Sequence, residues 1–410
     1  MSMNNLELLD VYLNDEPVGS LTLLPQDRII FNFSENYSRN KNRPVLSQSF
    51  YDQQKQLILN SPPTQTKSAP YFSNLLPEGH LRTYLATKAK VSEKRDFPLL
   101  HLLGNDLPGA IILKPSEHIK FEPTETDVQI EEDQRNETIL KFSLAGIQLK
   151  LSALMKARGG LTIPAHGTGG DWIVKLPSVH FNDVNENEFS MLTLAKSIGI
   201  DVPDIQLIDL KEINNLPEMA DHFSGKAKAL AVKRFDRDKN NRIHTEDFAQ
   251  VYGVYPHKKY DGVNYSNLAN MVENVAGTKQ TAQFIKRLIF NMLIGNGDMH
   301  LKNWSFIYRD KITPTLAPAY DYLATHLFIP EDNFAFNIGG EKALNKISQT
   351  HIKKFSEKAL LSHHFVNQIT QETIALTIKK FNHLKSDFPL AQAALKKIEH
   401  HILMVARNLY

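Results

Sequence analysis

Residues 284–308 constrain the fold of this chain more than any other segment, because they join an apolar helical pattern, a glycine-containing loop and a strand-like run. Apolar side chains recur at i, i+4 spacing at Phe284, Leu288 and Met292, which predicts a buried helix that ends at Gly295. The residues that follow the loop alternate as a strand up to residue 308. The segment therefore predicts a helix, a loop and a strand in that order.

The loop at 295–303 carries Asp298 and, five residues later, Asn303. This is the spacing that phosphoryl transfer requires, because the acid can accept the proton of an attacking hydroxyl while the amide reaches a magnesium ion. An ordinary turn remains an alternative, since Asn-Gly and Gly-Asp pairs are also common in hairpins.

Composition excludes several classes of protein. The chain has 410 residues, a formal net charge of only +2 and no cysteine. Disulfides, thiolate metal sites and cysteine nucleophiles are excluded, and no global field draws the chain to DNA or a membrane. No apolar run reaches the roughly 20 residues of a membrane-spanning helix, and Glu7 and Asp10 interrupt the apolar N-terminal stretch that a signal peptide would need. We expect a cytoplasmic protein.

The pattern of elements predicts several parts. Residues 1–115 read as a small α+β unit that begins with a β-meander, and 116–138 as an acidic linker, although an acidic surface loop within one domain explains the same residues. Residues 139–262 are strand-rich with one inserted helix at 186–198, and 263–410 are helical. We therefore predict an α+β, two-lobed protein-kinase-like fold behind an N-terminal subdomain.

Lys175 lies in a short β-branched run at 173–177 that predicts a strand. A buried ammonium is costly unless it is paired, so a lysine here suggests the strand lysine of a kinase, held by a glutamate of the next helix. Glu188 is the first candidate for that glutamate and Glu186 the second. A solvated edge strand would explain Lys175 equally well.

Two further segments fit the same order of parts. Lys233, Arg234 and Phe235 end a strand where a kinase hinge contacts adenine, although a solvated turn is the commoner explanation of such charges. Asp321, after the hairpin that follows the loop, stands where a second metal-binding acid is expected. The paired histidines lack the helical spacing of a metal site, so we predict no zinc.

The residues resemble, over nearly the whole chain, the HipA-type serine/threonine kinases of bacterial toxin–antitoxin modules. Six motifs occur in the family's order, at 75–79, 143–150, 173–177, 234–237, 296–303 and 320–321. The chain departs from the family pattern at Ile147 and Leu149 in the second motif, and Lys233 stands where an acid is common.

The resemblance implies a role for each matching residue. Asp298 matches the catalytic aspartate, Asn303 and Asp321 the magnesium ligands, and Ser143 the serine that the kinase autophosphorylates. The implied ATP-binding residues are Ala145, Gly146, Ile147, Gln148, Leu149, Lys150, Lys175, Lys233, Arg234, Phe235, His300, Leu301, Lys302, Asn303 and Asp321.

The resemblance also implies partners. Such kinases transfer the ATP γ-phosphate to a serine or threonine of another protein, aminoacyl-tRNA synthetases among them, and thereby halt growth. A helix-turn-helix antitoxin neutralises them, and DNA is contacted only through that antitoxin. The alternatives are a small-molecule kinase on a related fold and a kinase-like corepressor that acts by binding its antitoxin.

Overall fold

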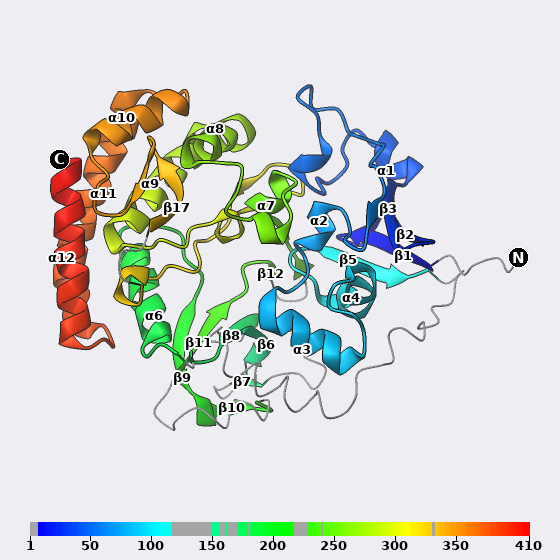
Figure 1. The fold of residues 1–410 in the computed structure, drawn as a ribbon, viewed down its shortest axis with the longest axis horizontal. Coiled ribbons are helices and arrows are strands. Elements are labelled where there is room, and N and C mark those ends of the chain that lie inside the picture. The colour runs from blue at the N-terminus through cyan, green and yellow to red at the C-terminus, as the bar shows by residue number, and fades with distance from the viewer. Residues whose placement is uncertain are drawn as a thin grey trace, which may run out of the picture.

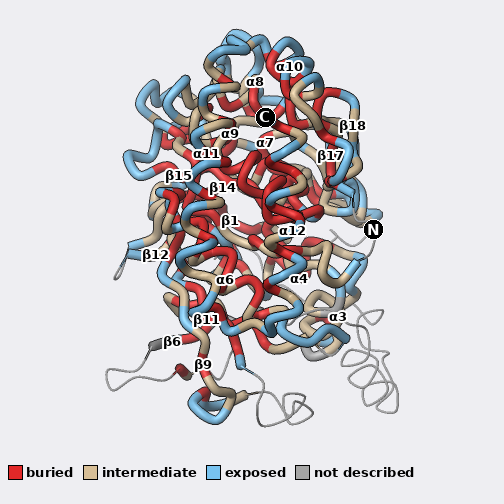
Figure 2. The backbone as a smooth tube through the Cα atoms, turned by 90° about the vertical axis from the view of Figure 1, so that its left-hand side faces the viewer, coloured by how far each residue is buried: buried red, intermediate tan, exposed pale blue. Residues whose placement is uncertain are grey.

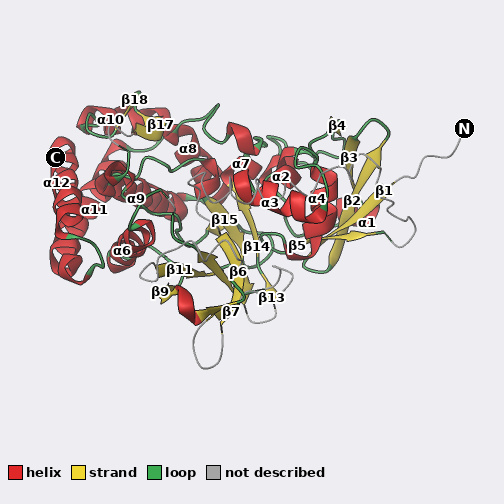
Figure 3. Cartoon of the chain, turned by 60° about the horizontal axis from the view of Figure 1, so that its bottom comes forward, coloured by secondary structure: helices red, strands yellow, loops and turns green. Residues whose placement is uncertain are grey.

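The structure is a computed structural model that describes residues 7–116, 150–155, 161–162, 170–178, 180–216, 228–238, 241–329 and 333–410. An N-terminal sheet unit, a strand-rich lobe and a helical lobe follow one another along the chain (Figure 1). In Figure 3 the N-terminal strands lie at one end of the molecule and the C-terminal helices at the other. The predicted α+β, two-lobed kinase-like architecture with an N-terminal subdomain is confirmed.

An antiparallel five-stranded sheet, in the order β4-β3-β2-β1-β5, forms the N-terminal unit. Its first hairpin turns at Asn14 and Asp15, whose φ angles of 49° and 66° suit a type I′ turn. Alternate residues Leu9, Val11 and Leu13 are buried, so one sheet face packs into the core of the unit. Its elements are β1 (Glu7–Leu13), β2 (Glu16–Leu24), β3 (Arg28–Phe33), α1 (Glu35–Arg39), β4 (Thr64–Gln65), α2 (Pro70–Ser73), α3 (Gly79–Ala89), α4 (Asp96–Leu103) and β5 (Ile111–Pro115).

The strand-rich lobe contains a six-stranded sheet in the order β10-β7-β6-β8-β11-β9. The helix α6 carries buried Leu192, Leu194 and Ala195, which belong to the core of the helical lobe. α6 therefore joins the two lobes by apolar packing. The elements are β6 (Lys150–Met155), β7 (Leu161–Thr162), β8 (Trp172–Lys175), α6 (Val184–Ser197), β9 (Ile205–Asp209), β10 (Ile213–Asn214) and β11 (Lys228–Lys233).

The helical lobe is organised around α9, whose residues Phe284 to Ile294 are nearly all buried. Figure 2 shows the buried stretches concentrated around α9, α7 and β14. Across the part of the chain that the structure describes, no helix combines the length and apolarity needed to cross a bilayer. The elements are β12 (Arg237–Asp238), β13 (Asn241–Arg242), β14 (His244–Asp247), α7 (Phe248–Val251), α8 (Tyr265–Ala276), α9 (Thr278–Ile294), β15 (Ser305–Tyr308), β16 (Thr315–Leu316), β17 (Asn333–Ile338), β18 (Glu341–Ala343), α10 (Gln349–Lys358), α11 (His363–Leu384) and α12 (Gln392–Leu409).

Residues 244–251 pack with the helical lobe, although the sequence pattern groups them with the strand-rich region that extends to 262. β14 pairs antiparallel with β15, with Thr245 opposite Ile307, and Phe248 contacts the ring of Trp304. A strand contributed from far upstream cannot be assigned from local pattern, because its partner lies about sixty residues away along the chain. The second strand of the hairpin that follows the loop, β16, is short and covers Thr315–Leu316.

A buried carboxylate on β14 connects the N-terminal unit to the helical lobe. Glu246, only 1% exposed, accepts hydrogen bonds from Ser47 Oγ at 2.5 Å, Gln48 N at 3.1 Å and the Tyr308 hydroxyl. Burial raises the pKa of Glu246 to about 7, even though these hydrogen bonds act in the opposite direction. This junction between the two parts therefore contains a carboxyl that titrates near neutral pH.

Stability should respond to the titration of Glu246. Its pKa is about 4.5 when unfolded and about 7 when folded, so the native state binds more protons across that window. The contribution of Glu246 to the free energy of unfolding should therefore fall as pH rises from about 4.5 to about 7. Urea unfolding of wild type and Glu246→Gln across this range should show a flatter pH dependence for the variant. The exposed control Glu35→Gln should follow wild type, and a Glu246→Gln curve parallel to wild type would contradict the assignment.

Candidate active site

The loop after α9 is buried except at Asp298. Gly295 caps the helix in the left-handed conformation with φ +68°, and Asn296, Met299 and His300 are all buried. Within residues 295–301, Asp298 is the one residue exposed to solvent. A carboxylate that projects from a loop embedded in the core has a fixed backbone and access to solvent, which are what a catalytic acid or base requires.

Hydrogen bonds to Tyr260 and to neighbouring residues of the loop hold Asp298. The Tyr260 hydroxyl donates to Asp298 Oδ1 at 2.5 Å. Asn303 Nδ2 donates to the Asp298 carbonyl oxygen at 2.7 Å, and Asp298 N donates to Asn296 Oδ1 at 3.2 Å. Because its amide nitrogen is used in this way, Asn303 is left with its amide oxygen as the atom suited to a metal ion.

Lys175 lies in a central strand, which decides against the solvated-edge alternative. β8 is flanked by β6 and β11, and Lys175 is only 5% exposed. Its ammonium contacts Glu188 Oε1 at 2.5 Å and also Asp321 Oδ1. Glu188 on α6, rather than Glu186, is thus the helix glutamate that pairs with this lysine.

The two carboxylates keep the buried lysine charged. Burial alone would lower the pKa of Lys175, but Asp321 and Glu188 outweigh it and hold the pKa above its usual range. The ammonium joins the strand-rich lobe, through β8 and α6, to the loop of the helical lobe that carries Asp321. Asp321 itself has a left-handed φ of 56°, a conformation in which aspartate is enriched among non-glycine residues.

Asn296 connects the Asp298 loop to the Asp321 loop. Its Nδ2 donates to the Asp321 carbonyl oxygen at 3.2 Å, while its Oδ1 accepts from Asp298 N. The Tyr320 hydroxyl adds a second link by donating to the Lys302 carbonyl oxygen at 2.9 Å. Tertiary structure therefore brings Asp298, Asn303, Asp321 and Lys175 into one region from three separate segments. Asn296 was not among the predicted site residues, although it lies in the same motif.

Three predicted ATP-binding residues of the loop have distinct environments. His300 is buried against Tyr260 with ring centroids 5.0 Å apart, and burial lowers its pKa to about 4, so the ring is neutral at pH 7. The Leu301 side chain is fully buried in the core of the helical lobe. Lys302 points to the N-terminal unit, where it contacts Glu78 Oε1 at 3.0 Å and donates to the Asn74 carbonyl oxygen at 2.9 Å.

The predicted hinge is tied to the N-terminal unit by a buried ion network. Arg234 contacts Asp236 at 2.9 Å and Asp106 at 3.3 Å, and Arg237 contacts both acids. Burial on its own would raise the pKa of Asp236, but the two guanidinium groups hold it below its usual range. Only the backbone of Arg234 is therefore available to a nucleotide, because its side chain is engaged in the network.

The two neighbours of Arg234 differ in exposure. Lys233 is exposed, with its ammonium 3.9 Å from Asp204 Oδ2. Phe235 lies with its ring centroid 5.7 Å from that of Tyr320, next to Asp321. A half-buried aromatic ring between the hinge and the Asp321 loop is suited to pack against a flat, apolar base.

The predicted phosphate loop lies outside the described residues. This applies to Ser143, Ala145, Gly146, Ile147, Gln148 and Leu149. Lys150 begins β6, where its backbone is paired with Lys175 of β8. The first residue of β6 therefore lies opposite the buried lysine on the neighbouring strand.

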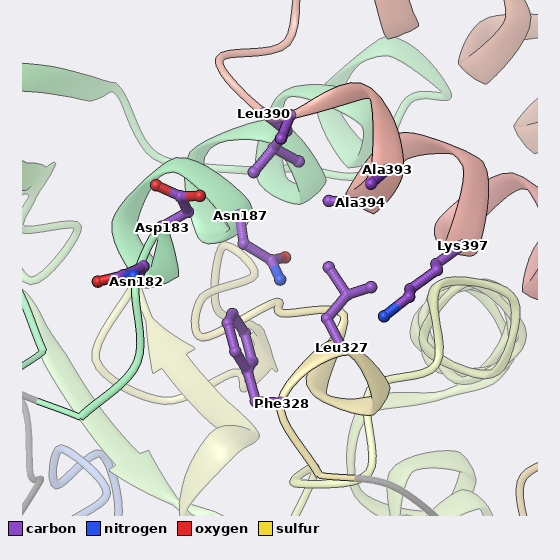
Figure 4. A pocket seen from close by; sticks show the side chains of 10 residues that line it. Asn182, Asp183, Asn187, Leu327, Phe328, Leu390, Ala393, Ala394 and Lys397 are labelled. Atoms are coloured by element: carbon purple, nitrogen blue, oxygen red, sulfur yellow. The ribbon is translucent and has the colours of Figure 1, made fainter.

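A cavity of about 240 Å³ lies elsewhere, between α6, the turn at 325–328 and the start of α12 (Figure 4). Asn187 lines it, and its carboxamide bonds both the N–H (3.0 Å) and the carbonyl (3.3 Å) of Ala324. None of the described residues that line this cavity belongs to the predicted site. Through these two hydrogen bonds, Asn187 links α6, which carries Glu188, to the segment that follows Asp321.

Fold and site together define a protein with a two-lobed kinase-like architecture. Comparison with known proteins identifies its family. The family model of the HipA-like C-terminal domain matches residues 142–382, and that of the HipA N-terminal domain matches 9–114. The chain belongs to the HipA family.

Relatives match the chain over most of its length. The protein Y4dM of Sinorhizobium fredii, described as a candidate kinase, is 45% identical over 402 residues, which are 97% of each chain. The serine/threonine-protein kinase toxin HipA of Shewanella oneidensis is 27% identical over 387 residues, 85% of this chain and 82% of that protein. A solved complex of the Shewanella HipA with HipB and operator DNA matches with a TM-score of 0.75 at 21% identity, covering 98% and 96% of the two chains.

Substitution of Gly295 should be more damaging than substitution of a comparable glycine. A Cβ at Gly295 would come within 2.3 Å of His326 Nδ1 and 2.9 Å of His401 Nε2, in addition to the strain of φ +68°. At Gly253, with φ +61°, the nearest atom would be 3.9 Å away. Gly253→Ala should cost about 1–2 kcal/mol from the backbone alone, and Gly295→Ala about 1–3 kcal/mol more. Urea unfolding measures the loss of stability in both variants. Equal losses would contradict the prediction, because they would show that His326 and His401 move aside at no cost in free energy.

Proposed function

We propose that this chain is an ATP- and magnesium-dependent serine/threonine protein kinase. The observation that carries the proposal is the exposed carboxylate of Asp298 on a buried loop, linked through Asn296 to Asp321 of the Lys175–Glu188–Asp321 cluster. Membership of the HipA family and the kinase names of its relatives support the same reaction class.

The reaction assigns a separate task to each group. The hydroxyl oxygen of the substrate forms a bond to the γ-phosphorus, the bond from that phosphorus to the bridging oxygen of ADP breaks, and Asp298 accepts the hydroxyl proton. The Lys175 ammonium, kept charged by its carboxylate partners, would neutralise phosphate oxygens. An exposed base and a buried cation therefore act on opposite ends of the transferred group.

The residues present fit a magnesium ion. Asn303 offers an amide oxygen and Asp321 a carboxylate, and oxygen donors of these kinds are what magnesium prefers. These two residues would hold it, and when bound it would supply neutralisation of charge on the phosphate oxygens. The Asp321 carboxylate also contacts the Lys175 ammonium.

The base assignment predicts a selective loss of activity. Asp298→Asn keeps the shape of the side chain and an oxygen for the Tyr260 hydroxyl, but removes the proton acceptor. Phosphate transfer from radiolabelled ATP to protein should fall by about 10²-fold or more, while ATP binding is kept. Asp310→Asn is a matched control, because Asp310 lies in an exposed turn, where it accepts hydrogen bonds from the Ile312 and Thr313 amides. Retained transfer in Asp298→Asn would refute the assignment.

The proposal extends to the biological role. We infer a toxin that phosphorylates a translation component such as an aminoacyl-tRNA synthetase and is neutralised by a DNA-binding antitoxin. The toxin name of the Shewanella relative and the presence of HipB and operator DNA in the matching complex support this role. The presence of operator DNA in that complex also supports a second candidate function, that of a corepressor. A kinase-inactive Asp298→Asn variant would retain repression.

Phosphorylation of Ser143 would inactivate the enzyme. A phosphate there adds about −1.5 to −2 charges, and at ~6 Å and an effective dielectric of ~20 each pair of like unit charges repels by roughly 3 kcal/mol. The modified loop should therefore be repelled from ATP phosphates. After incubation with ATP, wild type should bind a fluorescent ATP analogue more weakly than Ser143→Ala, and equal binding at full phosphorylation would contradict the idea.

A further inference from the structure

The carboxylate of Glu78 in the N-terminal unit contacts the Asp298 loop. Glu78 lies directly before α3, and its two oxygens contact different lysines, with Oε1 3.0 Å from Lys302 and Oε2 3.1 Å from Lys259. Lys302 is also held by the Asn74 carbonyl oxygen at 2.9 Å. The side chain of Glu78 makes no capping hydrogen bond to its own helix, so the carboxylate is committed to the two lysines.

Each of these lysines adjoins a residue that holds Asp298. Lys302 precedes Asn303, whose amide donates to the Asp298 carbonyl oxygen at 2.7 Å. Lys259 precedes Tyr260, whose hydroxyl donates to Asp298 Oδ1 at 2.5 Å. A backbone hydrogen bond from Leu301 N to the Lys259 carbonyl oxygen, at 3.2 Å, joins the two segments directly. Through Lys302 and Lys259, Glu78 therefore holds the two segments that donate hydrogen bonds to Asp298. We call this arrangement the brace.

The ion pairs of Glu78 with Lys302 and Lys259 are partly shielded from water. The side chains of Lys302, Lys259 and Glu78 are 15%, 24% and 33% exposed, so water screens these pairs less than it screens surface ion pairs. Burial alone would raise the pKa of Glu78, but the two lysines hold it below its usual value. Without this carboxylate, two ammonium groups would stand near each other, and among the described residues the remaining ion pair of either lysine joins Lys302 to Asp247 at 3.6 Å.

We propose that Glu78 is a positioning residue of the active site, which makes the N-terminal unit a structural part of the catalytic machinery. The inference rests on the proposed function and deepens it, since it assigns Lys302 to the brace between the two parts of the chain. Loss of the Glu78 charge lets the 298–303 loop and the Lys259–Tyr260 segment shift, and a shift of about 1 Å at a reacting group can cost 10²-fold in rate. The Lys175 cluster lies outside this brace, so the loss falls mainly on kcat.

The test compares Glu78→Gln with Glu16→Gln. Glu16 also forms an ion pair between the N-terminal unit and the helical lobe, 3.3 Å from Lys311, but both side chains are almost half exposed and neither residue adjoins Asn303 or Tyr260 in the chain. With radiolabelled ATP and casein as a generic hydroxyl-bearing acceptor, Glu78→Gln should lower kcat by about 10-fold or more, with KM for ATP within about twofold of wild type. Glu78→Asp, which retains the charge, should recover part of the rate, and Glu16→Gln should equal wild type.

A second measurement is independent of activity. The amides of Leu301 and Asn303 donate to the Lys259 and His300 carbonyl oxygens, so their hydrogen exchange reports on the braced loop. Exchange at both should be faster in Glu78→Gln and unchanged in Glu16→Gln, with thermal unfolding showing that both variants fold.

Wild-type rates and unchanged exchange in Glu78→Gln would overturn the inference. A wild-type chain that transfers no phosphate would instead refute the proposed kinase function. The exchange of Leu301 and Asn303 alone would then decide whether the brace exists, with faster exchange in Glu78→Gln supporting it and unchanged exchange overturning it.

Discussion

The buried ammonium of Lys175 is the interaction on which the arrangement of the two lobes depends. Removing a charge from water costs several kcal/mol, so Lys175 in a central strand needs partners, and it finds them in Glu188 of α6 and in Asp321 of the helical lobe. Three chain segments must therefore converge on one point. Because loss of either acid would leave a buried charge less compensated, the same contact that keeps the ammonium charged also holds the lobes together.

The N-terminal unit extends this arrangement rather than forming a separate appendage. It contacts the hinge through Asp106 with Arg234 and Arg237, and it contacts the loop of the candidate base through Glu78. A third junction, around Glu246, is buried and consists of hydrogen bonds to Ser47 and Gln48. Charged groups at these junctions are paired across the boundary, so their geometry is specified more sharply than apolar packing alone would achieve.

The sequence predicted the local elements well where the physical cause is local. The first hairpin follows from the turn residues Asn14 and Asp15, and α9 follows from i, i+4 apolar spacing that ends at Gly295. Sequence patterns could not choose between alternative placements of a strand where its partner lies far away along the chain. β14 belongs with β15 of the helical lobe, and neither its position nor the central place of β8 can be read from short-range pattern. Likewise, Lys302 lies in a motif that suggested ATP, yet its ammonium contacts Glu78 and Asn74.

The sequence by itself determined which chemical groups are available and in what order: a strand lysine, a helix glutamate, a loop aspartate with its asparagine, and a second aspartate, in the series of a HipA-family chain. Only the tertiary structure decided which of them meet. It paired Lys175 with Glu188 rather than Glu186, set Asp321 against the same ammonium and directed Lys302 to the N-terminal unit. The physical reason is that residue type and periodicity act over a few positions. The pairing of buried charges instead depends on which segments the apolar core brings within about 4 Å.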